Sequence, residues 1–360
     1  MNALPVTDAA LSTAISAHFS RAQRWGFIWA MWTAVLWGAW YVPGTALWYE
    51  KPYVDIPTDA MGLRLAATAV MTWIHAVMVF LFLLIWNGVL GKIPDYARTF
   101  VRFRRLSKWY ALASLCGGPI AIFGSYMAMG FVGPVFAAVT SLFYPVVGAV
   151  VARLWFNEKI SGRAALGMAI IIMGGVVIYG PGMFGELDLS KNHAWLGYLG
   201  GVMSAVGWGL EGAVAARAMD VSDPDAGIQC RFTFEVMFWG LIILPVLALF
   251  TQLPVTGLIG ETLGHGKAML WIVLAAACHA YCYTAFYKSF SLIGVSRGEA
   301  IGNLYAIFAL LFIAMFTLQF PQWYFVAGLV LTVLGSFVMF SESAESVAQL
   351  RETESVAEAS

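Results

Sequence analysis

Runs of apolar residues, each about 18–25 residues long, alternate with short polar segments along most of this chain. A helix of that length crosses a hydrocarbon layer about 30 Å thick, because each residue adds about 1.5 Å. Clusters of Gly and Pro, together with charged residues, separate most of the runs. The pattern predicts ten membrane-spanning helices, at 27–48, 60–86, 107–128, 133–153, 163–180, 195–216, 228–250, 269–290, 298–317 and 322–340.

The second half of the chain repeats the first at the level of single residues. The second and seventh predicted helices align at an offset of 166 residues, and the first and sixth align at 171. Each unit therefore has five helices, and an odd number inserts the second unit upside down. The predicted fold class is an all-α membrane protein of ten transmembrane helices in two inverted five-helix repeats. Six pairs share an offset of 161, namely Tyr126/Tyr287, Gly133/Gly294, Tyr144/Tyr305, Gly167/Gly328, Gly174/Gly335 and Val177/Val338.

The positive charges of the short loops predict the orientation. Six Lys and Arg residues lie between 92 and 108, and three more follow the fourth helix, so both loops are expected on the cytoplasmic side. The protein is then expected in the cytoplasmic (inner) membrane, with both termini on the cytoplasmic side. The predicted divisions are a cytoplasmic segment at 1–26, the repeats at 27–180 and 195–340, and an acidic cytoplasmic tail at 341–360.

The composition narrows the class of protein. The chain is 61% hydrophobic and 11% charged, which leaves too little polar surface for a soluble protein. It contains no Walker loop, no H-E-x-x-H motif and no acidic pair placed for an aspartyl-type site. We therefore expect no enzyme activity, catalytic residue, cofactor, metal or nucleic-acid partner. The expected partners are a small-molecule substrate and the lipid bilayer, with protons if a buried acid exchanges them; monomer and homodimer both remain open.

Several segments resemble a known family of membrane proteins. They are residues 34–40 (AVLWGAW), 133–145 (GPVFAAVTSLFYP), 157–162 (NEKISG) and the glycines of 167–175. Together with the ten helices in two units, they resemble the EamA-like branch of the drug/metabolite transporter superfamily over residues 27–340. The resemblance implies the inverted-repeat fold and a transport activity. The second unit departs from the pattern, because Gln319-Phe320 stands where the first unit has Glu158-Lys159, and Ala306 replaces Pro145.

Glu211 is the strongest candidate for a substrate residue. Ionisable groups inside a bilayer are costly and usually face a protein interior or a wet cavity. Its counterpart in the first unit is Trp40, so inversion is expected to place the carboxylate opposite Trp37, Trp40 and Tyr41. A carboxylate with aromatic faces suits an organic cation, and a desolvated carboxyl group could also exchange a proton for it. Alternatively, Glu211 pairs with an arginine such as Arg217 or Arg231 and only holds helices together.

Other polar residues of the predicted helices have weaker signals. Tyr144, Asn303 and Tyr305 lie on the fourth and ninth helices, which line the central cavity in the family that the chain resembles. Hydrogen bonding between helices would explain them equally well. His279 is a further substrate candidate, although a histidine buried against a neighbouring helix is the simpler interpretation. The candidates for coupling or gating are Glu211, His75, Glu235 and Glu299.

The predicted function is secondary active transport by alternating access, coupled to protons if Glu211 exchanges one. The substrate would be a small nitrogen-containing metabolite, either an organic cation or a zwitterion such as an amino acid or a quaternary amine. The alternatives are a carrier of sugars or nucleotide-type metabolites with the same fold, and an intramembrane enzyme. Residue types and spacing choose neither the substrate nor the direction of transport.

Overall fold

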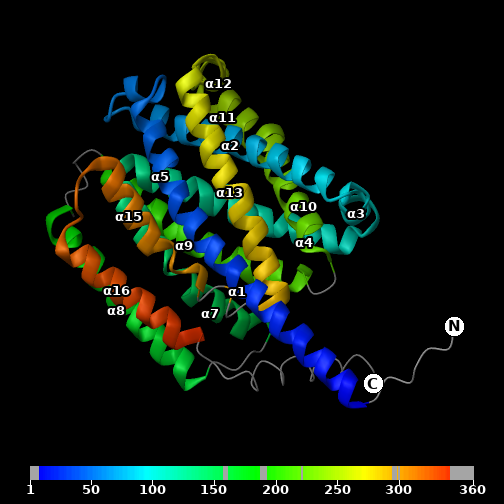
Figure 1. The fold of residues 1–360 in the computed structure, drawn as a ribbon. Coiled ribbons are helices and arrows are strands. Elements are labelled where there is room, and N and C mark those ends of the chain that lie inside the picture. Colours follow the sequence, from blue (N-terminus) through cyan, green and yellow to red (C-terminus); the bar gives the residue numbers. More distant parts are fainter. Residues whose placement is uncertain are drawn as a thin grey trace.

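The computed structural model describes residues 8–156, 161–186, 193–219, 222–293, 298 and 301–340. These residues form helices and turns, and no strand occurs among them (Figure 1). By length and composition, 6 helices can cross a membrane: Met61–Val89, Arg104–Phe131, Pro134–Val151, Ala194–Met219, Pro224–Thr251 and Gly266–Ser289. Three shorter helical stretches are also apolar, at Ala165–Ile178, Tyr305–Thr317 and Trp323–Met339.

Helices occupy the segments that the apolar runs predict, but their ends differ. The first helix begins at Asp8, well before the predicted start at 27. The bounds of all the helices follow in chain order. They are α1 Asp8–Ala46, α2 Met61–Val89, α3 Ile93–Ala97, α4 Arg104–Leu115, α5 Phe123–Phe131, α6 Pro134–Ser141, α7 Tyr144–Phe156, α8 Gly162–Glu186, α9 Ala194–Met219, α10 Pro224–Met237, α11 Leu244–Thr251, α12 Val255–Gly264, α13 Gly266–Ile293, α15 Tyr305–Thr317 and α16 Trp323–Phe340.

Two long helices contain a wider, π-helical turn. The turn η4 spans Cys116–Ile122 between α4 and α5 and contains Pro119, which cannot donate a backbone hydrogen bond. The turn η5 spans Phe238–Ile243 between α10 and α11, just before Pro245. Such turns absorb a missing hydrogen bond without ending the helix, and they often occur at functional sites. The first of them lies against the candidate site described below.

The fourth and ninth predicted helices are each interrupted at the same place in the repeat. A turn at residues 142–143 separates α6 from α7, and a turn at 303–304 precedes α15. Tyr144 and Tyr305, which are repeat counterparts, begin the helices after these turns. The interruption occurs in the second unit even though Ala306 replaces Pro145 there, so proline alone does not cause it.

Glycines allow helices of the two units to pack closely in matching ways. A side chain on Gly38 of α1 would collide with the backbone of Tyr305 and Ala309 in α15. A side chain on Gly209 of α9 would collide with the backbone of Tyr144 and Gly148 in α7. Each residue of the second contact is the repeat counterpart of one in the first. Removing the side chain lets the helix backbones approach, as small residues do in membrane helices.

The last helices of the two units form a pair of their own. In Figure 1, α8 and α16 run side by side at the edge of the molecule. Gly167 faces the backbone of Gly335, and Gly174 faces the backbone of Gly328. Both contacts join residues of opposite units, and exchanging each residue for its counterpart converts one contact into the other.

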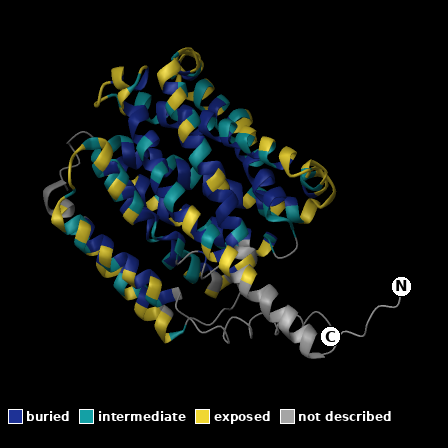
Figure 2. Ribbon diagram, viewed as in Figure 1, coloured by how far each residue is buried: buried dark blue, intermediate teal, exposed yellow. Residues whose placement is uncertain are grey.

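Several charged side chains are buried inside the molecule, while many large apolar side chains are exposed on its outside. Leu318 and Phe320 are 87% and 92% exposed, whereas Arg231 and Glu235 are fully buried. Figure 2 shows the buried residues gathered in the middle of the helices and the exposed ones on their outer faces. This is the reverse of a water-soluble protein and suits a surface covered by lipid.

A charged cluster joins the ends of α2, α10 and α13. The ammonium of Lys92 lies 2.6 Å from a carboxylate oxygen of both Asp223 and Asp225, and Lys288 lies 3.3 Å from Asp225. Asp223 also caps α10, accepting bonds from the backbone N–H of Asp225 and Ala226. Burial opposes ionisation of Asp223, but the bonds and charge of Lys92 and these amides hold its pKa below the ordinary value.

Candidate functional site

A buried triad of charged residues joins α9 and α10. Glu211 comes from α9, and Arg231 and Glu235 lie one turn apart on α10. The Nε atom of Arg231 donates to Oε1 of Glu211 at 2.7 Å, and its Nη1 donates to Oε2 of Glu235. Burying charges is costly unless they are paired, so this contact must be held in place by the surrounding helices.

Two adjacent glycines make room for the triad. Gly117 and Gly118 belong to the π-helical turn η4, where the chain passes directly against these side chains. A Cβ atom on Gly117 would collide with Arg231 and Glu211, and one on Gly118 would collide with Glu235. The sequence therefore permits the ion pairs by removing two side chains from the neighbouring helix.

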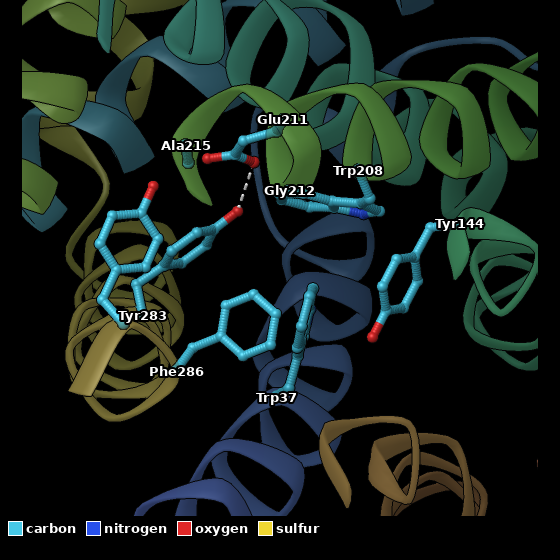
Figure 3. Close-up of a pocket in the computed structure, with 9 residues that line it drawn as sticks. Trp37, Tyr144, Trp208, Glu211, Gly212, Ala215, Tyr283 and Phe286 are labelled. Carbon is cyan, nitrogen blue, oxygen red and sulfur yellow. Dashed lines mark hydrogen bonds between the residues drawn. The ribbon is translucent and has the colours of Figure 1, made fainter. Parts of the chain in front are cut away.

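Glu211 also faces a pocket whose walls are largely aromatic. Figure 3 shows its carboxylate above the rings of Trp37 and Phe286, with Trp208 on the same helix. The hydroxyl of Tyr283 donates to Oε2 of Glu211 at 2.8 Å. The cavity volume is about 10 Å³, which is about the space that one water molecule needs. The lining residues are Trp37, Tyr144, Trp208, Glu211, Gly212, Ala215, Tyr283, Phe286 and Tyr287.

The triad has more carboxylates than cations. Two glutamates share Arg231, whose guanidinium carries one positive charge. Oε1 of Glu235 and Nη2 of Arg231 are buried without a hydrogen-bond partner. Buried polar atoms are normally satisfied, so Oε1 of Glu235 can accept a hydrogen bond or a proton, and Nη2 of Arg231 can donate to a water molecule or a ligand group. With aromatic faces beside Glu211, the arrangement suits a positively charged ligand.

The structure divides the predicted aromatic residues between two places. Trp37 and Tyr144 line the pocket with Glu211, and the Trp37 ring also stacks on Tyr305 with centroids 5.0 Å apart. Trp40, the repeat counterpart of Glu211, lies outside the lining. It packs instead against the rings of four residues, namely Tyr41, His75, Tyr126 and His279.

The residues predicted on the interrupted helices are all buried. Tyr305 donates to the backbone oxygen of Ala138 at 3.0 Å and stacks on Tyr41. Asn303 lies in the turn before α15, and neither its amide nitrogen nor its amide oxygen has a partner. An amide that is buried and unsatisfied at a helix interruption is a second place where a ligand or water can bind.

The two predicted histidines contact each other. Nδ1 of His279 lies 3.2 Å from Nε2 of His75, and both side chains are fully buried. The outer nitrogens, Nδ1 of His75 and Nε2 of His279, have no partner. His279 also packs against Tyr283, which connects the histidine pair to the pocket. No group of three or more His, Cys, Asp or Glu within the described ranges could hold a metal ion.

The structure describes only one of the other two acidic candidates, Glu235 and Glu299. Glu235 belongs to the triad, whereas Glu299 lies outside the described residues. The arginine alternative for Glu211 is present in the structure, because Arg231 bonds it directly. Pairing does not remove Glu211 from the pocket, since its second oxygen faces Tyr283 there.

The sequence did not lead to the selection of Trp208 or Tyr283, although signals for both exist. Trp208 is the repeat counterpart of Trp37, and their rings meet edge to face at 5.4 Å. Tyr283 lies four residues after His279, so both are on one face of α13. A chain of hydroxyls was also missed, in which Ser141 lies 2.6 Å from Ser204, and Ser204 lies 2.8 Å from Ser125.

These features define an integral membrane protein, because apolar helices of membrane length enclose buried, paired charges. Residues 195–341 match the sequence model of the EamA-like transporter family, which confirms the resemblance seen in the sequence. The match falls on the second unit, whereas all four of the resembling segments came from the first.

Comparison with solved structures supports the fold. Matches extend to 28 chains of solved structures. One of them, described only as "Crystal structure of protein", is 16% identical with a TM-score of 0.54. The similarity covers 89% of this chain and 96% of that one. No curated protein matches the chain. An identity this low carries the fold and no further property.

Proposed function

We propose that this chain is a secondary transporter that moves a small, positively charged or zwitterionic nitrogen compound across the cytoplasmic membrane. It works by alternating access between two inverted units of five helices, at 27–180 and 195–340, with both termini in the cytoplasm. The family match supports the class of transporter. The substrate, the coupling and the arrangement of units belong to the proposal.

The paired glycine contacts support the inverted arrangement. Gly38 meets α15 as Gly209 meets α7, residue for residue, and the α8–α16 contacts convert into each other when the units are exchanged. Matching contacts of this kind arise when a two-fold axis relates the units. In transporters built this way, the substrate site lies between the units.

One observation carries the proposed substrate class: a buried carboxylate, Glu211, forms part of an aromatic pocket between helices of both units. Trp37 and Tyr283 offer ring faces beside it, and an organic cation gains from both the charge and the rings. A neutral sugar would leave the charge of the triad uncompensated, so the pocket chemistry favours an amine or quaternary ammonium group.

The remaining predicted residues take roles within this proposal. As the interrupted helices move, the substrate would contact Tyr144, Tyr305 and Asn303. In the second half of its path through the protein, it would contact Trp40, Tyr41 and His279. Glu235 would act with Glu211 in coupling, and His75 would hold or pass a proton beside His279. Glu299 is proposed as a gating residue. Because the present cavity has space for about one water molecule, substrate entry requires the helices to separate.

The test is transport by the purified protein in proteoliposomes. A thermal-shift screen against amino acids, betaines, polyamines, aromatic cations and sugars first identifies a ligand, because a bound ligand stabilises the folded state. Flux of that ligand is then compared in wild type, Glu211→Gln and the exposed control Glu261→Gln, over a pH series with product analysis. Full flux with unchanged pH dependence in Glu211→Gln would refute the proposal, as would stabilisation by sugars alone.

A further inference from the structure

We infer that Arg231 sets the charge of the ligand: by cancelling one of two buried carboxylates, it leaves a site for a single positive charge, filled either by one proton or by a monovalent cation. This inference rests on the proposed function, since it concerns the same pocket. It adds the ligand's valence and the number of protons exchanged.

Arg231 already occupies the surroundings that would hold a ligand cation. Its guanidinium lies 4.1 Å from the ring centre of Phe232 and 5.1 Å from that of Tyr283. It also bonds both carboxylates, through Nε to Glu211 and Nη1 to Glu235. Arg231 is therefore a cation already bound by carboxylates and aromatic rings, which are the groups that would also bind a ligand cation.

The charges of the triad leave one negative charge without a partner. Arginine stays protonated in proteins, so the triad carries one net negative charge when both glutamates are ionised. A proton on either glutamate, or a monovalent cation beside it, makes the site neutral. A second positive charge would then be buried without compensation, which is strongly unfavourable. When the cation binds, the proton leaves the carboxyl oxygen for water, and the reverse occurs when the cation departs.

The structure offers places for the unpartnered charge. Oε1 of Glu235 is buried without a hydrogen-bond donor, and Oε2 of Glu211 faces the pocket beside Tyr283. A cation that enters the pocket meets Glu211 first. Arg231 can then remain bonded to Glu235, which is one turn away on its own helix. Arg231 therefore shares Glu211 with the ligand cation and stays in the site.

Other ionisable groups surround the triad on every side. They are His75 on α2, Cys116 in η4, Tyr126 on α5 and the α13 residues His279, Tyr283 and Tyr287. Of these six, the two histidines are the residue type whose unperturbed pKa lies nearest neutral pH. They hydrogen-bond each other, and a proton on either would add positive charge near Arg231. A variant of His75 therefore belongs in the test.

The experiment counts protons released on binding, using benzyltrimethylammonium as the monovalent probe and methyl viologen as the divalent one. Calorimetry of the purified full chain in two buffers with different ionisation heats gives the number of protons released. Wild type and Arg231→Lys should release up to about one proton per benzyltrimethylammonium. Arg231→Met has two unshared carboxylates, so it should release up to about two protons per methyl viologen and prefer methyl viologen by at least about tenfold. His75→Gln should keep the wild-type count.

A double variant keeps the test decisive if Arg231→Met does not fold. Arg231→Met with Glu235→Gln restores a single carboxylate, and it should regain the monovalent preference and the count of one. A folded double variant that binds no monovalent cation overturns the inference, as does Arg231→Met with an unchanged preference. A count that falls to zero in His75→Gln also overturns it, since the proton then belongs to the histidines. If wild type binds neither probe, the proposed function itself fails.

Discussion

Trp37 and Trp208 hold equivalent positions in the two sequence repeats, and their rings meet edge to face with centroids 5.4 Å apart. Residues related by a two-fold rotation contact each other only where they lie next to its axis. Both rings also line the pocket with Glu211. In the proposed arrangement, the axis that relates the two units therefore passes through the candidate site.

The first prediction concerns the paired glycine contacts. Gly38→Ala and Gly209→Ala should each destabilise the protein by about 1–3 kcal/mol, because the new methyl group meets the backbone of a neighbouring helix. Equivalent contacts should give similar costs in the two variants. Thermal unfolding in detergent, followed by circular dichroism, measures them.

Gly88→Ala is the matched control, since Gly88 is also helical and nothing lies within 4 Å of its added Cβ atom. It should be neutral or stabilise by up to about 1 kcal/mol, because alanine favours helix. A loss at Gly38 with no loss at Gly209 would contradict the equivalence of the two contacts.

The second prediction is that Gly117→Ala disables the cation site. The methyl group would displace Arg231 and Glu211 from each other, leaving buried charges less well paired. We expect cation binding to fall by at least about tenfold, measured by calorimetry with benzyltrimethylammonium. Gly148→Ala, where the nearest atom is 3.6 Å away, should bind normally. Normal binding by folded Gly117→Ala would show that the triad does not shape the pocket.

The third prediction isolates one hydrogen bond. Tyr283→Phe removes the hydroxyl that donates to Glu211 at 2.8 Å and keeps the aromatic ring. Hydrogen bonds to charged groups contribute about 1.5–3 kcal/mol, so the ionised carboxylate becomes less favourable. Cation binding should weaken about tenfold at neutral pH and recover partly at higher pH. A uniform loss at every pH would instead indicate a change in pocket shape.

The fourth prediction concerns stability in acid. The lowered pKa of Asp223 means that its ionised form stabilises the folded protein at pH values above the ordinary pKa of an aspartate. This contribution is lost as the pH falls through the lowered value. Because the side chain is about a third exposed, we expect only about 0.5–1 kcal/mol at neutral pH.

Asp223→Asn tests this, since asparagine can still cap α10 while losing the charge. The difference in melting temperature between wild type and variant should be largest at neutral pH and should shrink below about pH 4. Asp95→Asn, which removes a more exposed ion pair with Arg98, should show a smaller difference. A difference that is constant with pH would mean that the cap, rather than the charge, is responsible.

The helices were predictable because each apolar run is set by the thickness of the bilayer. Their ends were less so: α1 begins at Asp8, in a polar stretch whose helical tendency the apolar pattern does not report. The interruption before Tyr305 was also not predicted. No proline follows it, and only contacts with other helices can stabilise it there.

The site was predictable where a residue is unusually costly to place inside a membrane-spanning helix. Glu211 and Arg231 stand out as charges in apolar runs, and the sequence permitted their pairing as an alternative. The glycines at 117 and 118 are ordinary residues for membrane helices, so nothing local marks them, and Tyr283 is marked only by its spacing from His279. Their roles depend on which helix faces α9, which the spacing within a single helix does not determine.

The chain of three serines makes the proposed two-fold arrangement unsymmetrical. The three serines join both units, since Ser125 and Ser141 lie in the first unit and Ser204 lies in the second. Their repeat counterparts are Phe286, Gly302 and Thr33, so the contact between the units is polar on one side of the proposed axis and mostly apolar on the other. Two units with identical side chains would open to either side of the membrane with equal free energy. In the proposed transporter, the unequal trios are one difference that would break this degeneracy and favour one of the two open states at rest.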